Sequence, residues 1–139
     1  MSNSFYAKGL QHFSQGDINF PSDNIKCCLV TSAYTPDTSA SGDEHLSTIS
    51  GISGAIVQRS GNLSGKSNTG GVLKCSNITL SLVPVGHVIK YVVFYKDTGV
   101  DSTSILILID DTGNNLPTTT DGGDLTYQVG PGPNYLGAL

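Results

Sequence analysis

The chain has 139 residues and a formal net charge of −4, and its mean hydropathy lies close to zero at −0.02. Only 13% of the residues are charged, which excludes the low-hydropathy, high-charge composition that is typical of intrinsic disorder. Glycine, proline, serine, threonine and asparagine make up nearly half of the sequence, so coiled coils and long helical bundles are excluded and a β-rich, loop-rich chain is expected.

The first predicted element is a short amphipathic helix over residues 4–15, with Ser4 as its N-cap and Gly16 as the residue that ends it. The apolar residues of this segment recur at roughly helical spacing: Phe5, Tyr6, Leu10 and Phe13. We expect this apolar face to dock either on the body of the same chain or on a neighbouring subunit.

The first strand is predicted at residues 25–31, where a largely apolar run that includes one lysine, Lys26, is typical of a strand buried on both faces. Residues 32–43 have the composition of a loop, and residues 44–49 are compatible with a brief helical turn. Two further short strands are expected over residues 55–59 and 63–66.

The segment 77–83 alternates between apolar and polar residues, which predicts a strand with one buried and one solvated face. The buried face is expected to carry Ile78, Leu80 and Leu82. This is the clearest period-two pattern in the chain.

The two strongest strand signals follow at residues 88–96 and 104–110, which are rich in β-branched, aromatic and aliphatic residues. The polar segment between them predicts a hairpin. A last strand is expected at 125–129, followed by an irregular tail, 130–139, whose Tyr135, Leu136 and Leu139 are available for docking.

About six short strands with turn signals every 8–12 residues indicate a mainly β fold. We therefore predict a single antiparallel β-sandwich or partial barrel with a short N-terminal helix and an extended C-terminal tail. The whole chain, 1–139, is expected to form one domain, with residues 1–16 as a helical arm and residues 130–139 as the tail.

Catalytic chemistry is not expected from this sequence. Only three histidines are present, His12, His45 and His87, and no G-x-S-x-G motif places a nucleophile beside one of them. None of the glycine-rich stretches matches a phosphate-binding motif. We expect these histidines to lie on the surface or in turns.

Cofactors and metal ions are not expected either. Cys27 and Cys28 would point to opposite faces of a strand, and with Cys75 they lack the spacing of a zinc site, so reduced thiols are expected. The oxygen-rich segment 110–115 lacks the spacing of a calcium loop, and we interpret it as a polar turn.

The seven basic residues are scattered and include a single arginine, which argues against a nucleic-acid partner. The N-terminus lacks the basic and apolar regions of a signal peptide, and the apolar stretches fall short of the ~20 residues of a membrane helix. We expect synthesis in the cytoplasm, with no membrane partner.

Three stretches carry a recognisable order of scaffold and turn residues. The first opens the chain: Phe5-Tyr6, Lys8-Gly9-Leu10, Phe13 and Gly16-Asp17-Ile18. The second follows it: Asp23-Asn24-Ile25-Lys26 and Leu29-Val30. The third covers the late hairpin and turns: Tyr95-Lys96-Asp97-Thr98-Gly99-Val100-Asp101, Leu106-Ile107, Ile109-Asp110, Leu116-Pro117 and Gly122-Gly123-Asp124. From about residue 4 to residue 129, the chain resembles small virion structural proteins of tailed bacteriophages, of the kind found as head decoration or cement subunits.

This resemblance implies a non-enzymatic subunit on the outside of a capsid, often trimeric, that bridges neighbouring major capsid proteins. Its expected partners are the major capsid protein and further copies of the chain, and its expected location is the virion surface. The contacts are predicted at the two ends of the chain, through Phe5, Tyr6, Leu10 and Phe13 and through Tyr135, Leu136 and Leu139. The tail and Cys27-Cys28 differ from a typical member.

Two alternatives stay open. The chain could instead be a tail or neck component of the virion, present in low copy number. It could also be a carbohydrate-binding β-sandwich module, in which case Tyr34, Tyr91 or Tyr127 would supply the aromatic surface for a sugar.

Overall fold

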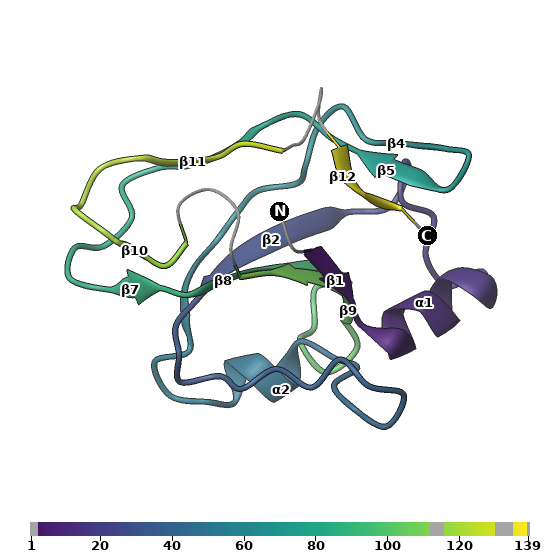
Figure 1. Cartoon of the computed structure of the whole chain (residues 1–139), viewed down its shortest axis with the longest axis horizontal. Coiled ribbons are helices and arrows are strands. Elements are labelled where there is room, and N and C mark those ends of the chain that lie inside the picture. Colours follow the sequence, from purple (N-terminus) through teal and green to yellow (C-terminus); the bar gives the residue numbers. More distant parts are fainter. Residues whose placement is uncertain (1–2, 112–115, 130–134, 139) are drawn as a thin grey trace.

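The computed structural model describes residues 3–111, 116–129 and 135–138. The chain folds as a mainly β protein with a large antiparallel sheet and a short N-terminal helix, as the sequence predicts. The large sheet has five strands in the order β1-β9-β8-β2-β3 (Figure 1). Its strands are β1 (Asn3–Phe5), β9 (Ile105–Asp110), β8 (Tyr91–Lys96), β2 (Ile25–Val30) and β3 (Ile56–Arg59).

Three small antiparallel sheets cover one face of the large sheet (Figure 1). They pair β10 with β7, β11 with β6, and β12 with β5 and β4. Their strands are β4 (Ser67–Thr69), β5 (Val72–Lys74), β6 (Ile78–Leu80), β7 (Val88–Ile89), β10 (Thr118–Thr119), β11 (Leu125–Tyr127) and β12 (Tyr135–Ala138). The opposite face is covered by α2 (Ser47–Ser50) and the loop before it, and α1 (Ala7–Ser14) lies at one end.

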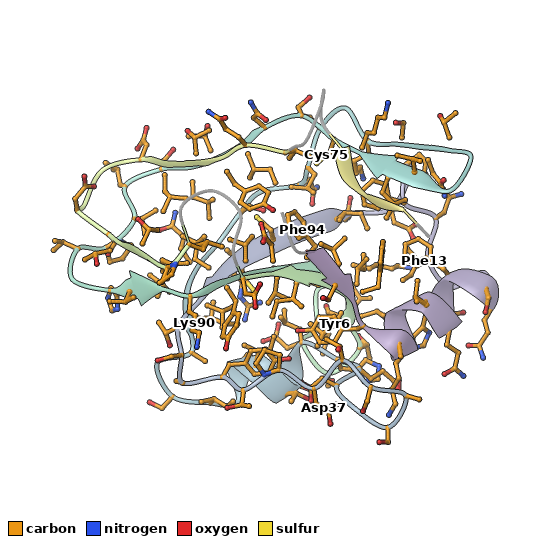
Figure 2. The ribbon with its side chains drawn as sticks, viewed as in Figure 1. Tyr6, Phe13, Asp37, Cys75, Lys90 and Phe94 are labelled. Atoms are coloured by element: carbon orange, nitrogen blue, oxygen red, sulfur yellow. The ribbon has the colours of Figure 1, made fainter. Side chains whose placement is uncertain are left out.

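Two apolar cores, one on each face of the large sheet, hold these layers together. Alternation along β2 sends Cys27 and Leu29 into the core under the small sheets, and Cys28 and Val30 into the core under α2. Figure 2 shows Phe94 and Cys75 on the side of the small sheets and Tyr6 on the side of α2. Because both faces are covered, the central strands are mostly apolar, and the prediction of a doubly buried first strand is confirmed.

A β-bulge breaks the alternation of β9 between the two cores. The register between β8 and β9 shifts between Phe94 and Tyr95, which leaves an extra residue on β9. Ile107 and Leu108 therefore both enter the core under the small sheets, although they are consecutive. The apolar run of this strand reflects the two cores, one on each face of the sheet, and the shift decides which residues face each core. The predicted hairpin with the preceding strand is confirmed.

Helix α1 packs directly on the backbone of β9 through a glycine. A Cβ atom built on Gly9 would lie 2.4 Å from the carbonyl oxygen of Leu106 and 3.2 Å from the Cα atom of Ile107. Just before the helix, the Tyr6 amide donates to the Ile107 carbonyl at 2.9 Å. The helix thus lies as close to the strand as two backbones allow.

The start of the predicted N-terminal helix is wrong. Ser4 does not cap it but lies in β1, where it pairs with Ile109, and the helix begins at Ala7 after Tyr6. Pairing with the edge of β9 gives the backbone N–H and C=O groups of residues 3–5 hydrogen-bond partners, which in a helix would have to come from the helix itself. Gly16, with a φ angle of +82°, ends the helix as predicted.

Three other element predictions are corrected. Residues 63–66 form no strand, and the nearby pairing instead joins β4 to β5. Residues 88–96 divide at Lys90 into β7, which pairs with β10, and β8, which pairs with β2 and β9. The tail is not irregular where the structure describes it, since β12 pairs with β5.

The alternation predicted for residues 77–83 fails at its last member. Ile78 and Leu80 are buried on β6, but Leu82 is 75% exposed and has a left-handed φ angle of +51°. The strand ends before this residue, so the period-two pattern no longer decides where its side chain points.

In the described part of the chain, no helix is long and apolar enough to cross a membrane.

Candidate functional site

The four apolar residues predicted for contacts in the N-terminal arm differ in exposure. Tyr6 is fully buried in its own chain, and Phe5 and Phe13 are partly buried against the core under the small sheets. Leu10 is 39% exposed. Of the four, Leu10 therefore has the side chain with the highest exposed fraction.

The contacts predicted in the C-terminal tail lie in and beside β12. This strand is at the outer edge of its three-stranded sheet, with Tyr135 opposite Lys74 and Ala138 opposite Val72. Leu136 is part of the same strand, whereas Leu139 lies outside the described residues. The tail thus contributes an edge strand, a type of element that can accept a further strand.

The loop of residues 81–88, here called the apolar loop, exposes three large apolar side chains that the sequence analysis did not select. Leu82 is 75% exposed, Val85 68% and Val88 54%. The loop lies at the end of the molecule where β7 pairs with β10 (Figure 1). Grouped exposed apolar side chains are typical of contact surfaces, because leaving them in water is costly.

Hydrogen bonds from residues 118–124 fix the backbone of the apolar loop. The Leu82 amide donates to Oδ1 of Asp124 at 2.9 Å, and the Val83 amide donates to the Gly123 carbonyl at 3.0 Å. Thr120 closes the loop: its amide donates to the His87 carbonyl at 2.8 Å. The left-handed Leu82 is therefore held in place by its surroundings, a property common in functional loops.

Two histidines that the sequence separates by 33 positions meet beside the only glutamate of the chain. Nε2 of His12 and Nε2 of His45 each lie 3.4 Å from Oε2 of Glu44, and one ligand atom from each residue lies within 4.8 Å of the other two. The exposed fractions of the three side chains are 19%, 34% and 31% for His12, His45 and Glu44. This group is here called the His–Glu cluster.

Charged neighbours contact the His–Glu cluster from two sides. Nδ1 of His12 lies 2.7 Å from Oδ2 of Asp17, and Nζ of Lys8 lies 3.8 Å from Oε1 of Glu44. The two imidazole rings are tilted by 59°, with their centres 6.3 Å apart. No local spacing in the sequence predicts this arrangement, because α1 and the loop before α2 come together only through their contacts with β9.

A buried polar network orders the loop that carries Glu44. The hydroxyl groups of Tyr6 and Tyr34 lie 2.8 Å apart, and the Tyr34 hydroxyl donates to Oδ2 of Asp43 at 2.6 Å. The Asp37 amide donates to the same carboxylate oxygen at 3.0 Å. Burial raises the pKa of Tyr6 and of Tyr34, so both phenols stay protonated and available as donors.

The tyrosines considered for sugar binding are all buried. Tyr127 and Tyr34 have exposed fractions of 0% and 1%, and Tyr91 of 9%. A sugar ring needs an open aromatic face, so these three residues do not form such a platform. The carbohydrate alternative loses the residues on which it was based.

Asp110 and the three cysteines, which were also considered for chemistry, are buried in the structure. Asp110 is fully buried and accepts a hydrogen bond from the Tyr127 hydroxyl at 2.6 Å, and Asn114 and Asn115 lie outside the described residues. Cys27, Cys28 and Cys75 are free and fully buried. Burial raises the pKa of Cys27 to about 12 and that of Cys75 to about 11, which makes these thiols unreactive.

Three surface depressions within the described ranges have volumes of about 160, 180 and 220 Å³. The first lies beside the apolar loop and is lined by Val83, Asp124 and Leu125 among others. Sites for small organic ligands usually measure about 300–1,000 Å³, so these depressions fit water or small ions better.

Comparisons with known proteins add no relative: no family model matches the chain, and no curated protein is significantly similar to it.

Proposed function

We propose that this chain is a non-enzymatic decoration, or cement, protein of a tailed-bacteriophage capsid. It binds the outer surface of the head as a homotrimer and stabilises contacts between major capsid proteins. The proposal joins the resemblance carried by the sequence to one structural observation, the apolar loop. In this proposal Leu82, Val85 and Val88 form the main contact with the capsid, and Leu10 and the edge strand β12 serve contacts between subunits.

The exposure and rigidity of the apolar loop support this role. Burying three side chains of this size releases roughly 1.5–3 kcal/mol each when burial is complete. Since the backbone is already fixed by Asp124, Gly123 and Thr120, little conformational entropy is lost on binding. Many copies on a shell then add modest contacts together through avidity.

The proposal is tested by adding purified protein to undecorated capsids of the phage that encodes it and measuring co-sedimentation. A variant that combines L82S, V85S and V88S is expected to lose most of its binding. The matched control is V100S, because Val100 is 55% exposed but lies in the turn between β8 and β9. Equal binding by the triple variant and the wild type would overturn the assignment of the loop.

The role of tail or neck component remains the alternative within the virion. It predicts a ring of few copies, whereas a cement protein predicts hundreds of copies per particle. Quantifying the chain against the major capsid protein in purified virions separates the two. Measuring its mass in solution tests the trimer.

A further inference from the structure

The spacing of the donor atoms in the His–Glu cluster matches the coordination sphere of a zinc ion. Zinc bonds to imidazole nitrogen and carboxylate oxygen at about 2.0–2.1 Å, so neighbouring ligand atoms of a tetrahedral site lie roughly 3.3–3.5 Å apart. Both nitrogen-to-oxygen separations in the cluster are 3.4 Å. One ligand atom of each residue lies within 4.8 Å of the other two, so an adjustment of the side chains would bring the third pair of ligand atoms to the same spacing.

The neighbours of the cluster prepare its atoms for a metal. Asp17 lies 2.7 Å from Nδ1 of His12, and a proton shared there leaves the lone pair of Nε2 pointing at the cluster. Carboxylates hold metal-binding histidines in this way in many proteins. Lys8 lies beside Oε1 of Glu44, which leaves Oε2 as the oxygen that both imidazoles face.

Backbone contacts with one strand, β9, position all three side chains. His12 is on α1, which lies against Leu106 and Ile107 because Gly9 has no side chain. The Glu44 carbonyl accepts the Leu106 amide at 2.9 Å, and His45 forms a bridge with Ile105. Since a rigid sheet fixes the backbone, little ordering is needed when a ligand binds.

We propose that His12, Glu44 and His45 form a zinc-binding site that joins helix α1 to the loop before α2. Two nitrogen donors and one carboxylate oxygen favour zinc over magnesium or calcium, which prefer oxygen alone. The three side chains are partly exposed, so water supplies the remaining ligand. Asp17 is a positioning residue, because it acts on the metal only through His12.

Zinc bound here links segments that are distant in the sequence. The folded chain presents the three ligands together, whereas the unfolded chain does not, so binding stabilises the fold in proportion to the logarithm of the zinc concentration. The inference is independent of the proposed virion role.

The test uses the full chain, purified and freed of metal with a chelator. Titration with zinc chloride in a calorimeter is expected to show one ion per chain, and zinc is expected to raise the midpoint of thermal unfolding. H12A and E44Q are expected to lose both effects. D17N is expected to weaken binding by about 10- to 100-fold, the usual cost of removing such a positioning carboxylate.

H87Q is the matched control, because His87 is an exposed histidine in the apolar loop, outside the cluster, and this variant should bind zinc normally. Cobalt provides a second readout: ligation by nitrogen and oxygen gives visible absorption without the near-ultraviolet band of a thiolate, which would indicate the cysteines instead. Far-ultraviolet circular dichroism checks that each variant folds without metal. Absence of saturable zinc binding, or binding unchanged in H12A and E44Q, would overturn the proposal.

Discussion

At the scale of single residues, the contact between Arg59 and Asp101 is the best-formed ion pair of the described chain. The two nitrogen-to-oxygen distances are both 2.8 Å, so the guanidinium and carboxylate groups meet as a fork. Asp101 also receives a side-chain hydrogen bond from Ser50, and its carbonyl accepts the Ser47 amide at 3.1 Å. One aspartate thus connects β3, α2 and the turn before β9.

The Arg59–Asp101 pair makes stability depend on pH in the acid range. Hydrogen bonding to Arg59 lowers the pKa of Asp101 to about 2, below its value in an unfolded chain of about 3.9. The stabilisation is therefore complete above about pH 4 and is lost as the pH falls through about 2. Because the two side chains are 39% and 34% exposed, solvent screens the pair, and its contribution to the free energy of unfolding is about 1 kcal/mol or less.

We predict that D101N lowers the free energy of unfolding by up to about 1 kcal/mol at pH 7 and by much less near pH 2. Urea denaturation at the two pH values measures this difference. In a double-mutant cycle, R59Q/D101N should be scarcely less stable than either single variant. Parallel loss of stability in the wild type and D101N between pH 4 and pH 2 would contradict the assignment.

At the scale of elements, the close packing of α1 on β9 depends on Gly9 having no side chain. An alanine usually improves an exposed helix by about 1 kcal/mol over glycine. Here its Cβ atom would lie 2.4 Å from a carbonyl oxygen that is held in a sheet. The steric conflict should outweigh the gain in helix propensity, because neither the strand nor the helix backbone can yield cheaply.

We predict that G9A lowers the free energy of unfolding by about 1–3 kcal/mol, the range for overpacking at a tight contact. Q11A is the control, since Gln11 is exposed on the same helix and should change stability by less than about 0.5 kcal/mol. Chemical denaturation followed by circular dichroism gives both values. A stabilised G9A would show that the helix is not packed as closely as described.

The elements also show how far the sequence could be interpreted. Near-continuous apolar runs predicted β2, β8 and β9, because strands covered on both faces carry apolar residues at most positions. The helix start predicted from Ser4 was wrong, because pairing with a distant strand overrode the tendency of this residue to cap a helix. The predicted burial of Leu82 was wrong too, because its exposure depends on a turn and on Asp124, 42 positions away.

The candidate sites were harder to predict than the fold. Near residue 12 the sequence shows only a histidine on a helix, and near residue 45 only a histidine beside a glutamate. Their meeting depends on the close approach permitted by Gly9 and on the hydrogen bond between Leu106 and Glu44. Neither relation is a local pattern, so no motif search along the chain could have found the cluster.

At the scale of the whole molecule, the three cysteines are divided between the two cores, so the reactivity of each thiol measures the opening of its own core. Cys27 and Cys75 belong to the core under the small sheets, and Cys28 belongs to the core under α2. All three are fully buried, and burial raises the pKa of each thiol. A thiol reagent reaches them only when the covering layer opens, and only the thiolate reacts.

We therefore predict that none of the three thiols reacts promptly with Ellman's reagent at pH 8 in the folded protein, whereas all three react at once in guanidinium chloride. For Cys27, with a pKa of about 12, the thiolate fraction is lower than that of an exposed cysteine by a factor of about a thousand or more. Slow labelling in native conditions, mapped by mass spectrometry, then measures how often each layer opens. Labelling of Cys28 ahead of the other two would mean that the layer of α2 opens independently of the small sheets. Prompt reaction of any of the three would contradict the buried arrangement. A covering layer would then have to open within the time of the prompt reaction, which two closed cores on one central sheet do not allow.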